Sequence, residues 1–306
     1  MKKTTTLAAS AAILLGLGLA GCSTAGEAAA PAGDSASATC PDGKIRFGIL
    51  PYEDPDRLEP AYQTLARALS EKLDCEVEVT ITEDYAAEVL AMENDQLEIA
   101  QFGPLGFVFA NERADATAMV SFGDAEGNPT TYTGGIWVPK DSKIQTIEDL
   151  KGHTLALGSP GSTSGDAIPM SALAAAGIED DVTADYAGGH PEALLALVNG
   201  TVDAAQINSQ TLATAVAAGT LDESKFRQVW KSEEIPNDPI TVRGNMPEEF
   251  KDAVQEALLS LDKADVEKVS GFLGVDPAGP LIPVTNETYK PLFDLAETMG
   301  LTEKDV

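Results

Sequence analysis

Short apolar segments alternate with amphipathic ones along most of the chain, and this alternation constrains the fold more than any other feature. Between the apolar segments, side chains recur at helical spacing, as they do from Tyr62 to Leu73. Strands that are separated by helices of this length form parallel pairs through right-handed crossovers. The pattern predicts an α/β fold with mainly parallel sheets flanked by helices. The predicted strands are 45–50, 77–81, 97–102, 154–157, 204–207 and 226–230.

The strand–helix units fall into two sets, which predicts two lobes. Two segments rich in β-branched residues, 133–138 and 240–243, lie where the chain would leave the first lobe and return to it. They are the predicted hinge strands. The predicted boundaries are residues 44–133 plus 241–306 for lobe 1 and residues 134–240 for lobe 2.

The N-terminus predicts export. Lys2 and Lys3 precede an apolar run at 7–19, which ends in Leu-Ala-Gly directly before Cys22. This order is typical of a secretory signal peptide, and the run is too short for a membrane-spanning helix. The cysteine matches a bacterial lipobox, which predicts a signal peptide at 1–21 and a lipid on Cys22 that holds the protein on the extracytoplasmic face of the cell membrane. A cleaved signal with a chance cysteine is the alternative.

Residues 22–43 are predicted to be a lipid anchor and flexible tether, because they contain little apolar mass to offset the entropy cost of ordering. Cys40 and Cys75 lie just before the first and second predicted strands. If these strands are parallel neighbours, both cysteines lie at the same end of the sheet. Disulfides persist in exported proteins, so a Cys40–Cys75 disulfide is expected, with two buried thiols as the alternative.

The formal net charge of −29 excludes nucleic acid as a partner, since such a surface repels phosphate backbones. An anion site in this chain must therefore depend on local dipoles and aimed donors. The only histidines are His153 and His190, and the sequence has no clustered cysteines and no His-Glu-x-x-His. It predicts neither a metal site nor a cofactor.

The segment Gly161-Ser162-Thr163-Ser164-Gly165 lies between a predicted strand and a predicted helix. Three hydroxyls at a helix start, together with unpartnered backbone N–H groups and the helix dipole, suit an oxyanion. An ordinary serine cap is the alternative. The segment is not a phosphate-binding P-loop, because it lacks Gly-Lys-Ser/Thr. It is not the nucleophile elbow of a hydrolase either, because Thr163 stands where that motif needs serine.

Four further positions are candidates for ligand contacts. His190 stands at another helix start, where it could donate to an anion or simply cap the helix. Asp238, in a turn between two prolines, could accept a hydrogen bond from a protonated ligand oxygen or an ammonium group, or only form the turn. Tyr85 opens a helix, and Phe102-Gly103 ends a strand, where open α/β sheets place ligands.

Five short motifs occur in one order between residues 44 and 300, and together they resemble the phosphate/phosphite/phosphonate-binding proteins of ABC importers. The resemblance implies a two-lobed, type II periplasmic-binding-protein fold that closes on its ligand. The motifs are Asp84-Tyr85-Ala86-Ala87, Glu98-Ile99-Ala100-Gln101-Phe102-Gly103-Pro104, Ser162-Thr163-Ser164-Gly165, Gly188-Gly189-His190 and Ile235-Pro236-Asn237-Asp238-Pro239-Ile240.

The resemblance also implies roles for these residues. The hydroxyls and N–H groups of residues 162–164 would hold the phosphoryl oxygens, and Tyr85 and His190 would add hydrogen bonds from either side of the cleft. Asp238 would take the ligand's proton or amine. The implied partners are an ABC permease and its ATPase, and a monomer is expected.

Two departures from the family bear on the ligand. Members often carry Trp-Tyr-Gly where this chain has Gln101-Phe102-Gly103, and aminoethylphosphonate binders carry an acid at a position loosely aligned with Gln210. These differences favour phosphite or a short alkylphosphonate, with phosphate and aminoethylphosphonate as alternatives. A sensor subunit of the same fold, or an extracytoplasmic esterase or phosphatase using Ser162 or Ser164, would be rival functions.

Overall fold

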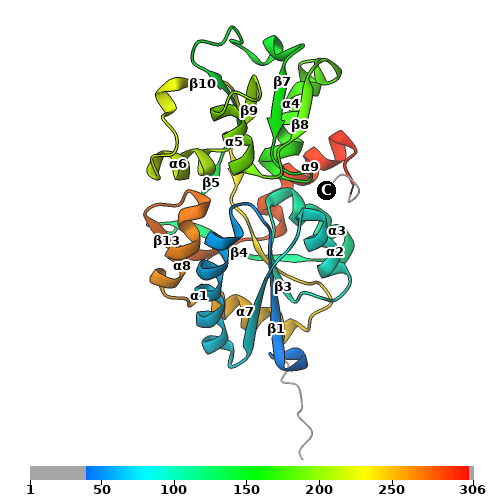
Figure 1. Cartoon of the computed structure of the whole chain (residues 1–306). Helices are drawn as coiled ribbons and strands as arrows, with labels where there is room; N and C mark the ends of the chain where they lie inside the picture. Colours follow the sequence, from blue (N-terminus) through cyan, green and yellow to red (C-terminus); the bar gives the residue numbers. More distant parts are fainter. Residues whose placement is uncertain (1–38, 303–306) are drawn as a thin grey trace, which may run out of the picture. The chain divides into compact units, whose positions relative to one another are not determined.

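The computed structural model describes residues 39–302. The predicted signal peptide, the lipidation site Cys22 and most of the predicted tether therefore lie outside the described residues. Within the described part, no helix has both the length and the apolar character needed to cross a bilayer. Two mixed sheets and the helices packed on them make up this part of the chain (Figure 1).

The first sheet has six strands in the order β13-β4-β12-β3-β1-β2. The pairs that β1 forms with β2 and β3 are parallel, and the remaining neighbours are antiparallel. The strands are β1 Lys44–Ile49, β2 Glu76–Ile81, β3 Ile99–Gln101, β4 Thr117–Asp124, β12 Ile240–Val242 and β13 Ala278–Pro283.

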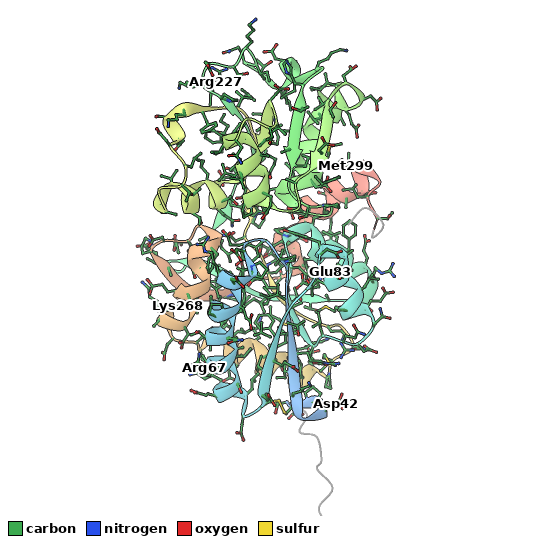
Figure 2. The ribbon with its side chains drawn as sticks, in the orientation of Figure 1. Asp42, Arg67, Glu83, Arg227, Lys268 and Met299 are labelled. Carbon is green, nitrogen blue, oxygen red and sulfur yellow. A yellow bond between two sulfur atoms is a disulfide. The ribbon has the colours of Figure 1, made fainter. Side chains whose placement is uncertain are left out.

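Helices cover both faces of this sheet. On one face, α1 packs together with α7 and α8 against strand residues such as Phe47 and Val120. On the other, α2, α3 and α9 bury residues such as Ala100 and Ala118, because alternate strand residues face opposite sides. Charged side chains point outward into solvent, as Figure 2 shows for Arg67. The helices are α1 Pro55–Leu73, α2 Tyr85–Glu93, α3 Pro104–Ala114, α7 Glu248–Leu259, α8 Lys263–Ser270 and α9 Lys290–Met299.

The second sheet has five strands in the order β10-β6-β9-β7-β8. β7 is parallel to β8 and β9, and β6 is antiparallel to β9 and β10. Helix α4, Ile168–Ala175, packs on one face, and α5, His190–Val198, packs on the other beside α6, Ser209–Ala217. The strands are β6 Gly135–Pro139, β7 Thr154–Leu157, β8 Thr183–Tyr186, β9 Ala204–Gln206 and β10 Phe226–Lys231.

A short antiparallel ribbon joins the two sheets. It consists of β5, Thr131–Tyr132, and β11, Ile235–Pro236. The sequence placed the hinge strands at 133–138 and 240–243, but most of these residues form β6 and β12, which lie inside the two sheets. Their apolar side chains are fully buried, so the sheets include the segments that looked most like hinges. Each strand of the linking ribbon has only two residues, which is too short for an alternating pattern of apolar and polar side chains to be recognised in the sequence.

The expectation of mainly parallel sheets was wrong, because both sheets are mixed. The strands β6 and β12 are the first that the chain forms after it has passed through the linking ribbon into their sheet. They run antiparallel to their neighbours β9 and β3. The crossover rule holds only for strands linked by a helix on one face of the same sheet. The proposed boundaries of the two lobes remain a prediction.

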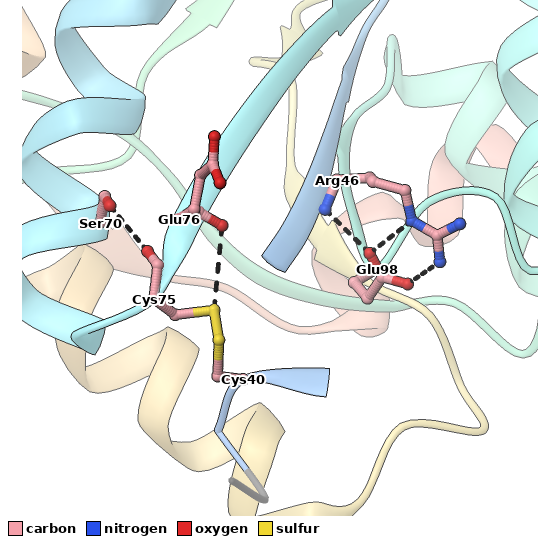
Figure 3. The surroundings of a disulfide bond; sticks show 6 residues. All are labelled: Cys40, Arg46, Ser70, Cys75, Glu76 and Glu98. Atoms are coloured by element: carbon pink, nitrogen blue, oxygen red, sulfur yellow. Dashed lines mark hydrogen bonds and ion pairs between the residues drawn. A yellow bond between two sulfur atoms is a disulfide. The ribbon is translucent and has the colours of Figure 1, made fainter. Parts of the chain in front are cut away.

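The disulfide between Cys40 and Cys75 is confirmed, with Cα atoms 5.5 Å apart (Figure 3). It forms because β1 and β2 are parallel neighbours, so the residues that precede them lie at one end of the sheet. Ser70 Oγ donates to the Cys75 carbonyl at 2.7 Å, and at the same end Arg46 Nε donates to Glu98 at 3.0 Å. The bond closes a loop with a sequence separation of 35 residues.

Replacing both cysteines by serine should lower the free energy of unfolding by roughly 3–4 kcal/mol, the chain-entropy value for a loop of this length. Urea unfolding of wild type and the Cys40→Ser, Cys75→Ser double variant would measure the difference. Wild-type protein under reducing conditions is the matched control and should unfold like the variant. An unchanged midpoint would mean that the disulfide does not constrain the unfolded chain.

Candidate functional site

A small, partly open cavity lies where segments from both sheets end. Its volume is about 20 Å³. Several of its lining residues directly follow strands, as Leu50 follows β1 and Asn208 closely follows β9, the position that open α/β sheets use for ligands. The lining residues are Leu50, Tyr52, Tyr85, Gly103, Tyr132, Ser162, Thr163, Ser164, His190, Asn208, Gln210 and Asp238.

Eight of the nine ligand-site residues proposed from the sequence line this cavity. The exception is Phe102, which is 1% exposed and packs in the apolar cluster that α2, α3 and α9 form behind the cavity. Leu50, Tyr52, Tyr132 and Asn208 were missed. Leu50 ends the first predicted strand and Tyr52 follows it closely, so the rule applied to the Phe102-Gly103 strand end would have found them.

The Gly-Ser-Thr-Ser-Gly segment forms a tight turn into a helix. Ser162 caps the first turn, and its Oγ accepts from the Gly165 N–H at 3.1 Å. A Cβ on Gly165 would lie 2.7 Å from Ser162 Oγ and 2.9 Å from His190 Cε1, so only glycine fits there. Gly161 has φ +76°, a left-handed conformation that favours glycine. Both glycines are therefore required by the shape of the turn.

All three hydroxyl oxygens of this segment accept a hydrogen bond from the protein. Besides Ser162, Thr163 Oγ1 accepts from the Leu105 N–H at 2.9 Å, and Ser164 Oγ accepts from Asn208 Nδ2 at 3.4 Å. A hydroxyl has one proton and two acceptor sites, so accepting a bond leaves its proton available for another acceptor. The hydroxyls of Thr163 and Ser164 are thus arranged as donors beside the cavity, whereas Ser162 also lies within hydrogen-bond distance of His190.

His190 is buried and neutral at pH 7. Burial lowers its pKa to about 4, although the Gln206 side chain opposes the shift. Nδ1 lies 3.1 Å from Gln206 Oε1, and Nε2 lies 3.3 Å from Ser162 Oγ. With this orientation of the Gln206 amide, Nδ1 carries the proton and Nε2 accepts from Ser162. His190 therefore holds the Ser162 hydroxyl in place in this arrangement, and its contact with a ligand stays a prediction.

Asp238 provides the acidic side of the cavity. It is 5% exposed, and burial raises the pKa of its carboxyl to about 7, while the Gln101 amide, 3.5 Å away, works in the opposite direction. Among residues 39–302, no lysine or arginine lines the cavity. Asp238 is therefore close to half protonated at neutral pH without a cation beside it.

The turn that carries Asp238 is held from several sides. The carbonyl of Asn237 accepts from the Tyr289 hydroxyl at 2.8 Å, and Asn237 Nδ2 donates to Thr130 Oγ1 at 2.8 Å. Ser121 Oγ donates to the Asp238 carbonyl at 2.9 Å. The backbone of Asp238 is thus anchored to β4, to the segment before β5 and to the turn before α9.

Gln210 faces the same cavity as an acceptor. Its Nε2 donates to Asn237 Oδ1 at 2.7 Å and to the Leu273 carbonyl at 3.0 Å. Both amide hydrogens are used in these bonds, so its carbonyl oxygen remains for a ligand. The cavity is therefore polarised, with hydroxyl donors after β7 and oxygen acceptors at Asp238 and Gln210.

The profile of a family described as "ABC transporter, phosphonate, periplasmic substrate-binding protein" matches residues 47–289. The chain belongs to this family. It is 29% identical over 278 residues to the phosphonates-binding periplasmic protein of Escherichia coli K12, covering 85% of this chain and 81% of that protein. It is 25% identical over 277 residues to the phosphate-import protein PhnD of Mycolicibacterium smegmatis, covering 84% and 86%.

Solved structures agree with this assignment. A binding protein component of an ABC phosphonate transporter from Pseudomonas aeruginosa has a TM-score of 0.72 at 25% identity, covering 82% of this chain and 84% of that one. The comparisons confirm the resemblance and the two-lobed type II fold. This phosphonate-family protein is thus an extracytoplasmic substrate-binding protein of an ABC transporter.

Behind the cavity of this substrate-binding protein lies a buried polar chain. Gln101 donates toward Asp238, and the hydroxyls of Tyr52 and Tyr62 lie 2.9 Å apart. Burial raises the pKa of both tyrosines far above the ordinary value, so they stay neutral. Gln101 therefore puts a donor next to the Asp238 carboxyl group.

Asp238→Asn should stabilise the ligand-free protein at pH 8. Because the pKa of Asp238 is raised in the folded state, the folded protein binds more protons than the unfolded chain between about pH 4 and pH 7. Its free energy of unfolding therefore falls as pH rises through this window, by up to about 4 kcal/mol at 1.36 kcal/mol per pKa unit.

Thermal unfolding of wild type and Asp238→Asn at pH 5 and pH 8 would test this. We expect the variant to have the higher Tm at pH 8 and a smaller advantage at pH 5. An equal Tm difference at both pH values would show that Asp238 is not a buried titrating group.

Proposed function

We propose that the cavity captures a small phosphorus oxyanion and that the protein delivers it to the permease of an ABC importer. Phosphite or a short alkylphosphonate is the favoured ligand, with phosphate and aminoethylphosphonate as alternatives. The observation that carries the proposal is the arrangement of two available hydroxyl protons, on Thr163 and Ser164, opposite one carboxyl group, with no described cation lining the cavity.

The donor side suits an oxyanion. The hydroxyl protons of Thr163 and Ser164 are available, and the first N–H groups of the helix that begins at Thr163 have no acceptor within the helix. The helix dipole adds partial positive charge at the same place. The hydroxyls of Tyr85 and Tyr132 line the cavity too, and burial keeps both neutral by raising their pKa.

The acceptor side selects for a ligand that carries a proton. A P–OH group or an ammonium group can donate to Asp238 and to the Gln210 carbonyl oxygen, whereas a fully deprotonated anion would meet the carboxylate without a shared proton. A buried charge pair of like sign is costly in a cavity that lacks a cation. Above pH 7, where the Asp238 carboxyl is mostly ionised, sulfate should therefore bind poorly, so the ligand comparison below is made at pH 8. The acceptor at Gln210 also keeps an aminoalkylphosphonate among the alternatives.

The relatives support the ligand class. The names of the Escherichia coli and Mycolicibacterium smegmatis proteins refer to phosphonates and phosphate. A structurally similar protein from Prochlorococcus marinus, with a TM-score of 0.72 and 20% identity, covering 87% of this chain and 100% of that one, was solved with methylphosphonate. The proposal includes lipid attachment at Cys22, action as a monomer, and lobes with the predicted boundaries.

Capture requires no chemistry. The Leu105–Thr163 hydrogen bond already links α3 on the first sheet to the helix start after β7 in the second sheet. A ligand that bonds to residues from both sheets would favour this closed arrangement over an open one by its difference in affinity. The closed form would then be the one presented to the permease.

Ligand-induced stabilisation tests the proposal directly. The mature chain carrying Cys22→Ser, which prevents lipidation, would be heated with phosphite, phosphate, methylphosphonate, ethylphosphonate, aminoethylphosphonate or sulfate. A ligand at about 100 times its Kd stabilises by roughly 2.7 kcal/mol, which should raise the Tm by several degrees. We expect a shift with one or two phosphorus compounds and none with sulfate.

Ser164→Ala should weaken binding of the responding compound by roughly 1–3 kcal/mol, since a ligand oxygen loses its donor. Ser171→Ala, on α4 outside the cavity, is the matched control and should bind like wild type. Folded, ligand-free protein that responds to none of the phosphorus compounds would disprove the proposed ligand class.

Gly103→Ala should discriminate among ligands by size. The added Cβ would lie 3.4 Å from Leu50 Cδ1, 3.6 Å from Thr163 Oγ1 and 3.7 Å from Tyr85 Cε1, which are ordinary contacts. The fold should tolerate the methyl group, which takes up room within the cavity. We expect phosphite affinity to change little and ethylphosphonate affinity to fall about 10-fold or more, measured by calorimetry. Equal losses for both ligands would show that the substituent does not lie against Gly103.

A further inference from the structure

A second hollow lies on the surface next to the ligand cavity. This α5–α6 groove has a volume of about 260 Å³. Its apolar floor comes from α5 and α6, chiefly Leu194, Leu195, Val198 and Ala215. Its opposite wall comes from the start of α1, which packs on the first sheet, through Glu53 and Arg57. The groove therefore combines elements of both sheets.

The groove is rich in exposed apolar surface. Leu195 and Val198 on α5 line the groove and are 56% and 42% exposed, and Val216 on the neighbouring α6, which does not line the groove, is 43% exposed. Two of the six large apolar side chains that are exposed in the described part of the chain therefore line the groove. Scattered exposed leucines are ordinary, but a cluster along a groove is typical of an interaction surface.

The groove and the ligand cavity share three stretches of backbone. In Tyr52–Glu53, His190–Pro191 and Gln210–Thr211, the first residue lines the cavity and the second lines the groove. A displacement of any of these stretches changes both hollows together. An occupant of the groove would therefore contact the segments that a bound ligand fixes in place.

The charged residues around the groove are mainly acidic, which favours a partner with basic residues. Arg57 is the only cation among the described lining residues, and it pairs with Glu53 at 3.3 Å and lies 5.1 Å over the Phe272 ring. The neighbouring acids Asp54, Asp56 and Glu192 are exposed. The whole chain carries a formal charge of −29. A complementary partner has apolar side chains flanked by lysine or arginine.

We propose that the α5–α6 groove docks an extracytoplasmic segment of the importer's permease, with an apolar residue in the groove and basic residues against the acidic rim. This inference rests on the proposed delivery of ligand to a permease. Because the groove needs helices from both sheets in their closed arrangement, docking favours the ligand-bound form. A membrane of anionic lipids would be repelled by the same rim, and so would a second copy of this acidic chain.

The test compares two exposed leucines, Leu195 at 56% and Leu259 at 38% exposure. Leu195→Glu puts a charge in the groove, and Leu259→Glu puts one on α7, where the side chain is 38% exposed and outside the groove. Both full-length proteins would be titrated against the importer's permease–ATPase complex in proteoliposomes, with ATP hydrolysis as the readout. Phosphite affinity would be measured for each in parallel.

We expect Leu195→Glu to raise the concentration for half-maximal ATPase stimulation about 10-fold or more, with an unchanged Kd for phosphite. Leu259→Glu should behave like wild type. The wild-type concentration should also rise with salt, since the rim attraction is screened. Normal stimulation by Leu195→Glu, or equal losses in both variants, would overturn the proposal.

Two further outcomes are distinguishable. A wild-type dimer by light scattering that Leu195→Glu dissociates, with ATPase stimulation intact, would assign the groove to self-association and overturn the proposal. Wild-type protein that binds no phosphorus oxyanion, yet stimulates the ATPase in a Leu195-dependent manner, would support the docking surface while refuting the proposed ligand.

Discussion

The hydrogen bond from the Leu105 N–H to Thr163 Oγ1 joins the two halves of the molecule at the place where the cavity forms. Leu105 lies in the first turn of α3 on the first sheet, and Thr163 lies in the turn that follows β7 in the second. The same bond occupies an acceptor site of the hydroxyl and leaves its proton for a ligand. The hydrogen bond that connects the two sheets therefore also orients the Thr163 hydroxyl as a donor toward the cavity.

The proposed oxyanion site lies in a cavity of a strongly acidic chain. No described lysine or arginine lines it, so its positive potential comes from hydroxyl protons and helix-start N–H groups that act only at short range. Asp238 adds a carboxyl group whose pKa burial has raised to about 7. Because burial raises this pKa, the carboxyl group lowers the free energy of unfolding at neutral pH. A buried group that destabilises the fold in this way is a candidate for a role in ligand binding.

Much of the architecture could be predicted because periodicity and turn residues are local. Most predicted strand segments correspond to strands, and the disulfide followed from two parallel neighbours. The errors concern segments whose state depends on distant partners. β4, β8 and β13 escaped notice, since they become strands by pairing with residues far along the chain. Residues 133–138 and 240–243 looked like hinges, but burial on both faces drew most of them into the sheets.

The sequence by itself determined the α/β class, the family and eight of the twelve residues that line the cavity, because motifs at strand ends and helix starts are readable locally. Only the tertiary structure decided which of them donate and which accept. His190 became an acceptor through Gln206, Gln210 kept only its carbonyl oxygen through Asn237 and Leu273, and Phe102 turned into the core. Proton positions and buried pKa values depend on neighbours far away in the chain, and a linear pattern does not contain them.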